Sequence, residues 1–106
     1  MAKYLFQASY TSEGAKGLIE DGGTKRRNAV EKFIEGFGGK MEAFYYAFGK
    51  DDVYVVVDVP DHVSAAAASL AVASSGVVSI KTTVLLTPEE IDKAAKKAVG
   101  YHPPGN

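Results

Sequence analysis

Apolar and polar residues alternate along much of this chain with a period of two, and that period predicts β-strands. Over residues 3–10 the large apolar side chains stand at every second position. Similar alternation, or a run of β-branched residues, predicts strands over residues 41–48, 53–59 and 77–86. Residues 49–52 lie between the second and third strands, and their number and composition predict an antiparallel hairpin.

Two helices are predicted between the first and second strands. A weak, broken helix follows the cap candidates Thr11 and Ser12, because glycines interrupt it. A stronger helix begins at a cap on Thr24 and carries apolar residues at helical spacing. The glycine pair at 38–39 ends this second helix, as a glycine after the last turn often does.

Two more helices are predicted in the second half of the chain. Asp61 caps a helix made mostly of alanine, which Ser-Gly at 75–76 ends. The sequence Thr-Pro-Glu-Glu at 87–90 has a capping threonine, a proline in the first helical position and a glutamate three residues after the cap. It begins a last helix that runs to about Val99.

The elements follow the order β-α-β-β-α-β with an added C-terminal helix, which is the split βαβ or ferredoxin-like pattern of the α+β class. We expect a four-stranded antiparallel sheet with helices on one face, in a single domain over residues 1–99. The Pro-rich residues 100–106 are predicted to form a flexible tail.

A sheet covered on one face leaves the other face open, and here the residues predicted for that face are mixed in polarity. They are Leu5, Val56 and Leu85 beside Gln7, Tyr54, Asp58, Lys81 and Thr83. Such a face suits packing against the sheet of a second copy, and a small core gains from that association. The alternative is the partly wetted face of a monomer. We expect Asp58 and Lys81 to pair on this face, as an interface ion pair or as a couple that handles a proton.

Composition excludes more functions than it selects. The chain has 106 residues and a net charge of −1, so it lacks the basic surplus that drives nucleic-acid binding. No apolar run approaches the roughly 20 residues of a membrane helix, and the start has no signal-peptide pattern, so we expect a cytoplasmic protein without a membrane partner. The absence of cysteine and the presence of two histidines argue against a metal site, and no cofactor is predicted.

Six side chains are candidates for binding a small organic ligand, since phenols join an apolar body to a polar tip and charged groups orient a polar ligand. They are Tyr10, Arg27, Tyr45, Tyr54, Asp58 and Lys81. Arg27 ends a run of three cations whose ordinary interpretation is a solvated surface, and it lies one turn before the apolar Val30. His62 and Asp58 are candidates for a catalytic base, although a histidine at a helix start is ordinarily a solvated residue.

Several short motifs resemble those of the GYD-domain family. They are Gly38-Gly39-Lys40, Ala43-Phe44-Tyr45, Gly49, Asp52-Val53, Pro60-Asp61, Gly76-Val77-Val78, Lys81-Thr82-Thr83 and Thr87-Pro88-Glu89-Glu90, together with Tyr-Thr-Ser-Glu-Gly-Ala at 10–15. The resemblance covers residues 3–96 and implies a ferredoxin-like, dimeric α/β-barrel architecture, without implying an activity. The family motif Gly-x-Tyr-Asp stands here as Gly-Lys-Asp-Asp, with Asp51 in place of the tyrosine.

Three functions follow as hypotheses. The preferred one is a homodimer, or a higher even oligomer, that binds a small organic molecule between sheet and helices or at the junction of two sheets. The second is a cofactor-independent oxygenase or isomerase of the kind that other dimeric α/β barrels support, by analogy of fold alone. The third is a structural or regulatory oligomer without a ligand.

Overall fold

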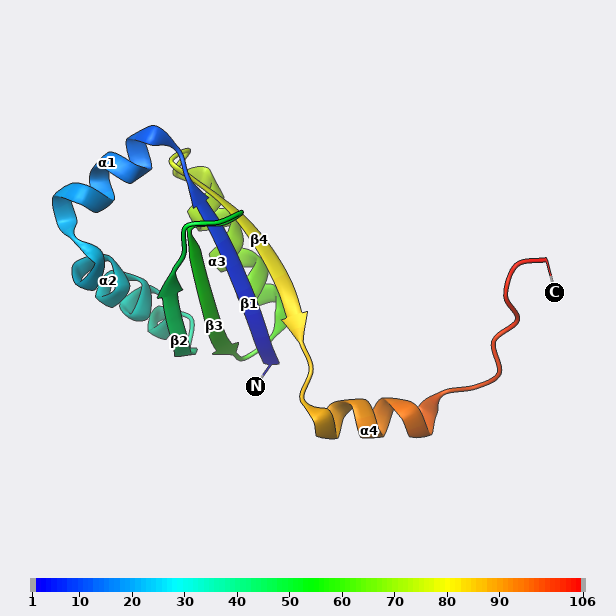
Figure 1. Cartoon of the computed structure of the whole chain (residues 1–106). Helices are drawn as coiled ribbons and strands as arrows, with labels where there is room; N and C mark the ends of the chain where they lie inside the picture. The colour runs from blue at the N-terminus through cyan, green and yellow to red at the C-terminus, as the bar shows by residue number, and fades with distance from the viewer. Residues whose placement is uncertain (1, 106) are drawn as a thin grey trace.

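Antiparallel strands form one sheet in the order β2-β3-β1-β4 in the computed structural model, which describes residues 2–105 (Figure 1). The strands are β1 (Ala2–Tyr10), β2 (Lys40–Tyr46), β3 (Val53–Val59) and β4 (Val78–Leu85). Every predicted strand is present, and the α+β, ferredoxin-like fold is confirmed. Met1 of the predicted domain and Asn106 of the predicted tail lie outside the described residues.

Helices α2 and α3 cover one face of the sheet, and α1 packs beside α2 near the end of β1 (Figure 1). The helices are α1 (Ser12–Asp21), α2 (Gly23–Gly36), α3 (His62–Ser74) and α4 (Pro88–Lys97). Helix α4 extends away from the sheet, and residues 98–105 form neither helix nor strand. Within residues 2–105, no helix is both long enough and apolar enough to cross a membrane.

The predicted caps of three helices are confirmed. Thr11 caps α1 through its side chain, and the carboxylate of Asp61 accepts a hydrogen bond from the backbone N–H of Ser64 at 2.8 Å. Thr87 and Glu90 form the reciprocal capping box of α4. Helix α1 is continuous rather than broken, because a capped helix tolerates interior glycines that each cost only about 1 kcal/mol.

The cap predicted at Thr24 is wrong. Helix α2 begins two residues earlier than that cap implies, at Gly23, and its N-cap is Gly22, which has no side chain to accept a hydrogen bond. Gly22 has a φ of 83°, a left-handed conformation that favours glycine, and its N–H donates to the carbonyl of Leu18 at 2.8 Å. One glycine therefore ends α1 and begins α2, which leaves Thr24 inside the first turn.

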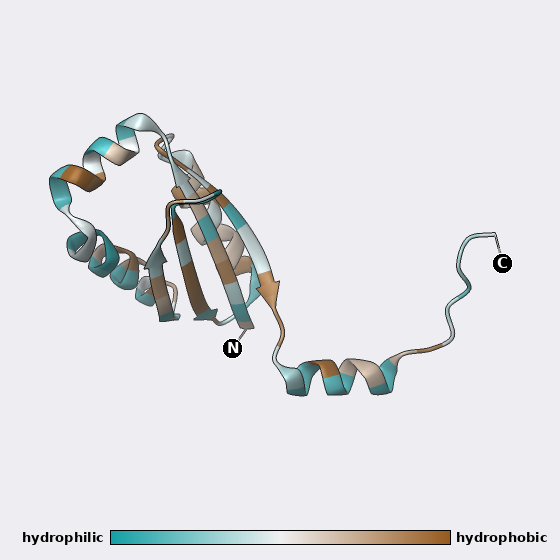
Figure 2. Ribbon diagram, viewed as in Figure 1, coloured by the Kyte–Doolittle hydropathy of each residue, from teal (hydrophilic) through white to brown (hydrophobic). Residues whose placement is uncertain are grey.

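Alternate residues of β3 form the base of the core. Val57 and Val59 are 0% exposed, and Val53 and Val55 are buried on the same, helix-covered side, as predicted. The remaining core residues are Tyr4 and Phe6 of β1, Ile34 of α2, Met41 of β2, and Ala65 and Ala68 of α3. Apolar residues accordingly concentrate in the central strands (Figure 2). The two buried alanines let α3 approach the sheet closely.

Gly39 lies where the chain turns from α2 into β2 and passes close to β3. A Cβ at this position would lie 2.7 Å from the carbonyl oxygen of Asp58 and 3.0 Å from Cγ2 of Ile34. We predict that Gly39→Ala lowers the free energy of unfolding by about 1–3 kcal/mol, the usual cost of overpacking. Urea denaturation followed by far-UV circular dichroism measures the change.

Gly36→Ala is the matched control for this substitution. A Cβ on Gly36 would meet nothing within 4 Å, and alanine favours the helix by up to about 1 kcal/mol. We expect this variant to equal or exceed the wild type in stability. Equal stabilities for the two variants would contradict the close approach at Gly39.

Candidate functional site

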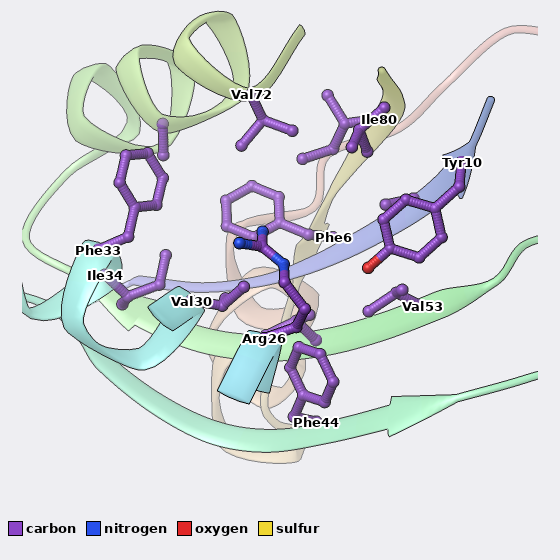
Figure 3. Close-up of a pocket in the computed structure, with 14 residues that line it drawn as sticks. Phe6, Tyr10, Arg26, Val30, Phe33, Ile34, Phe44, Val53, Val72 and Ile80 are labelled. Carbon is purple, nitrogen blue, oxygen red and sulfur yellow. The ribbon is translucent and has the colours of Figure 1, made fainter. Parts of the chain in front are cut away.

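An apolar cavity lies where α2 and α3 stand over the sheet without packing closely against each other. It has a volume of about 90 Å³. Phe6 and Ile80 contribute from the strands, Phe33 from α2 and Val72 from α3 (Figure 3). We call this space the central cavity. Its lining is apolar because it is the unfilled part of the hydrophobic core.

Two further hollows adjoin the central cavity. An interhelical cleft of about 280 Å³ lies between α2 and α3 and shares Arg26, Val30, Phe33 and Val72 with the cavity. A groove of about 380 Å³ beside α1, which we call the α1 groove, shares Tyr10 with it. The shared residues make the three spaces neighbours, and the shared side chains lie between them.

Among the residues described, two with polar side-chain groups line the central cavity, Tyr10 and Arg26. Burial raises the pKa of the Tyr10 phenol, while the nearby charge of Arg26 acts in the opposite direction. Burial also raises the pKa of Tyr46 in the adjoining α1 groove, and its hydroxyl donates to the carbonyl of Gly23 at 2.9 Å. Both phenols therefore stay protonated at neutral pH and act as hydrogen-bond donors.

This arrangement can hold a molecule that is mainly apolar and has a polar end. The walls offer aliphatic and aromatic contact. Arg26 lies on the side of the cleft and Tyr10 on the side of the α1 groove, close enough for the charge of Arg26 to act on the phenol. Within residues 2–105, no three His, Cys, Asp or Glu side chains gather in a way that could hold a metal ion.

Of the six predicted ligand-binding residues, the structure brings Tyr10 to the central cavity. Arg27 faces elsewhere, since its guanidinium donates to Glu31 at 3.0 Å and to the side chain of Asn28 at 3.2 Å. The neighbouring Arg26 lines the cavity in its place. Successive residues of a helix point about 100° apart, so only one of two consecutive cations can point into the core.

The other predicted residues lie on the open face of the sheet, away from α2 and α3. Tyr45 is 71% exposed there, and Tyr54 stands beside it on β3. The charged residues are Asp58 and Lys81. They share the face with the predicted apolar residues.

The predicted pairing of Asp58 with Lys81 is wrong. Asp58 stands opposite Lys3 in the β1–β3 register and accepts from its Nζ at 3.1 Å. Lys81 stands opposite Gln7, further along β1, and donates to Asp51 at 3.4 Å. Strand register therefore separates the two residues along β1, although both lie on one face.

The catalytic candidates are not brought together with the cavity. His62 is exposed as the first residue of α3 and lines none of the three hollows. Asp58 lies on the opposite face of the sheet, in contact with Lys3. Neither side chain belongs to the lining of the central cavity, which includes Tyr10 and Arg26.

The model of the GYD domain family matches residues 4–95 of the 106-residue chain. The chain belongs to the GYD-domain family. The resemblance of its motifs is thereby confirmed. No curated protein and no solved structure matches the chain.

In this GYD domain, the aspartate that replaces the tyrosine of the family motif is buried. Asp51 is 3% exposed and accepts hydrogen bonds from Ser9 Oγ at 2.9 Å and Gln7 Nε2 at 3.2 Å, besides its contact with Lys81. The hydrogen bond from Ser9, and then the charge of Lys81, lower the pKa of Asp51. Sequence reasoning missed this role, although it had placed Gln7 and Lys81 on one face.

Asp52, the next residue, binds the backbone at the end of β1. Its carboxylate accepts from the backbone N–H of Tyr10 at 2.9 Å, and its own N–H donates to the carbonyl of Ala8 at 2.8 Å. These bonds hold the end of β1 where Tyr10 lines the cavity. The hairpin thus positions one polar residue of the candidate site.

Asp51→Asn tests the buried carboxylate. Because the folded pKa of Asp51 is lowered, its charge stabilises the fold above the unfolded pKa of about 3.9 and loses this effect as the pH falls through the folded value. We predict that the variant melts below the wild type at pH 7 and that the difference narrows below about pH 4. Thermal unfolding across pH 2–8 is the measurement. Asp92→Asn on α4 is the control, and a pH-independent difference for Asp51→Asn would refute the assignment.

Proposed function

We propose that this GYD domain is a homo-oligomeric protein that binds a small organic molecule between the sheet and helices α2 and α3. The observation that carries the proposal is the apolar central cavity, which adjoins the interhelical cleft and shares with it several lining side chains, the cation Arg26 among them. A core that only stabilised the fold would fill this space, because protein interiors are close-packed. The cysteine-free sequence suits a cytoplasmic location, which we include in the proposal.

The size of the space supports a ligand that occupies both the cavity and the cleft. The enclosed part, at about 90 Å³, is smaller than typical ligand pockets of about 300–1,000 Å³, but the adjoining cleft adds about 280 Å³. Among the first ten residues of α3, the apolar residues larger than alanine are Val63 and Leu70, and they are 66% and 72% exposed. Small side chains such as Ala68 and Ala71 therefore leave room beside α2.

Filling the cleft tests the binding site. We predict that Ala71→Trp weakens binding of the neutral fluorescent probe N-phenyl-1-naphthylamine about tenfold or more, because the indole would occupy the space between the helices. Ala66→Trp is the control on the same helix, at an exposed residue that lines no hollow. Fluorescence titration measures both affinities. Failure of the wild type to bind the probe would overturn the proposal and favour the structural oligomer without a ligand.

The open face supports the oligomeric part of the proposal. Leu5 and Val56 stand there side by side in neighbouring strands, beside Tyr54, and no helix of residues 2–105 covers them. The face is mixed rather than uniformly polar, as expected for a sheet that packs against another sheet. A second copy of the chain is the partner that we propose for it.

The surface area of the chain also supports self-association. Its accessible surface is 7302 Å², whereas a compact monomer of 11.2 kDa has roughly 5,700 Å². Its radius of gyration is 16.8 Å, against about 13 Å for a compact domain of this length. The excess of roughly 1,600 Å² on one chain is about twice the roughly 800 Å² that each partner contributes to a standard interface. Helix α4 contributes to it, since Ile91 is 51% exposed on a helix that extends from the body (Figure 1).

A charge on the open face tests self-association. We predict that the wild type sediments as a dimer or higher even oligomer of the 11.2 kDa chain, and that Val56→Lys shifts it toward monomer. A lysine there would bury an unpaired charge in the interface but would reach water in a monomer. Val63→Lys is the control, because Val63 is 66% exposed on α3. Sedimentation velocity gives the masses, and a monomeric wild type at 100 μM would contradict the proposal.

The enzymatic alternative has less support from the site. Its candidate bases, His62 and Asp58, lie at an exposed helix start and on the opposite face of the sheet. The groups at the cavity are a guanidinium and a phenol, which bind and orient more readily than they abstract protons at neutral pH.

A further inference from the structure

We propose that the ligand of the central cavity is a hydrophobic monocarboxylate, an apolar body with one carboxylate that pairs with Arg26. This inference rests on the proposed binding function and specifies the class of molecule. It is carried by the position of Arg26, which lines both the cavity and the interhelical cleft.

Arg26 differs from the cations on either side of it in having no acidic partner along the helix. Lys25 lies 3.8 Å from the carboxylate of Asp21, and Arg27 lies 3.0 Å from that of Glu31, each one turn away. The residues one turn from Arg26 are Gly22 and Val30, which have no charge. Among residues 2–105, the structure pairs Arg26 with no carboxylate.

Arg26 is half-buried, and apolar residues surround the part of its side chain that lies in the cavity. Its side chain reaches from α2 into the cavity, among residues that include Phe6, Val30 and Phe44 (Figure 3). A guanidinium that loses water without gaining an anion is destabilising. The first turn of α2 adds to this, because it holds cations and no acidic residue at the positive end of the helix dipole. A carboxylate bound beside Arg26 would offset both effects.

Tyr10 supplies a second contact for the same carboxylate. Its hydroxyl points into the cavity on the side of Arg26 (Figure 3), and its phenol is protonated at neutral pH, since burial raises its pKa further above the ordinary value of 10.0. A guanidinium and a phenol together suit the two oxygens of one carboxylate. The rest of the lining is apolar, so a ligand with several charges, such as a nucleotide, would leave the others unpaired.

A pair of matched ligands tests the inference on the unmodified protein. Sodium octanoate and 1-octanol have the same chain length and differ in the charge of the head group. We expect the full-length wild type to bind octanoate at pH 7 at least tenfold more tightly than 1-octanol, as charge-assisted hydrogen bonds allow. Displacement of N-phenyl-1-naphthylamine, or calorimetry, measures both affinities.

Variants of two neighbouring cations assign the effect to its residue. Arg26→Met is expected to remove the preference for octanoate while it leaves 1-octanol binding within about threefold of the wild type. Arg26→Gln serves as a second, polar replacement if the methionine variant unfolds. Lys25→Met, which removes an exposed cation from the same turn, is expected to keep the preference.

The outcomes separate this inference from the proposed function. Equal binding of octanoate and 1-octanol by the wild type, or an unchanged preference in the Arg26 variants, overturns the monocarboxylate and leaves the binding function standing. Absence of binding for octanoate, 1-octanol and the naphthylamine probe overturns the binding function itself. A preference lost in Lys25→Met as well as in Arg26→Met would assign the effect to overall charge and overturn the role of Arg26.

Discussion

The four valines at alternate positions of β3 determine which side of the sheet each other residue occupies. Val57 and Val59 are completely buried under the helices, and a shift of one residue would turn all four toward the open face. Because β3 pairs with both β1 and β2, its register also places Tyr4 and Phe6 in the core and Lys3 opposite Asp58 on the other face. The central cavity and the open face are therefore two consequences of one alternation.

Strands and caps could be predicted from the sequence because their signals are local. Alternation in β3 and the capping box at Thr87 and Glu90 each depend on residues within a few positions, and both are present in the structure. The cap at Thr24 failed for a local reason as well. Thr24 and Gly22 are both possible N-caps, and residue preference alone favours the polar Thr24. The structure uses Gly22 because its left-handed backbone joins α1 directly to α2.

The polar contacts of the site could not be predicted in the same way, because they depend on small geometric choices. To predict that Arg26, and not Arg27, lines the cavity, one must know the rotation of α2 about its axis to within one residue, or about 100°. The apolar positions of α2 form too broad a stripe to define that rotation. The partners of Asp58 and Lys81 could be predicted only from the register of β1 against both β3 and β4. The burial of Asp51 required knowing how the hairpin folds over the sheet, which composition does not specify.

The hairpin between β2 and β3 contacts both the open face of the sheet and the end of β1 that carries Tyr10. Asp51 accepts hydrogen bonds from Ser9 and Gln7 on the open face, whereas Asp52 holds the backbone N–H of Tyr10 beside the cavity. Neighbouring residues in one turn thus contact the open-face side chains of β1 and the backbone at its end. A partner packed over the open face would restrict the Asp51 contacts, and through the adjacent residue it would also restrict the end of β1 that carries Tyr10. The proposed self-association and the proposed ligand binding would therefore share a structural element, even though the surfaces that they would use lie on opposite faces of the sheet.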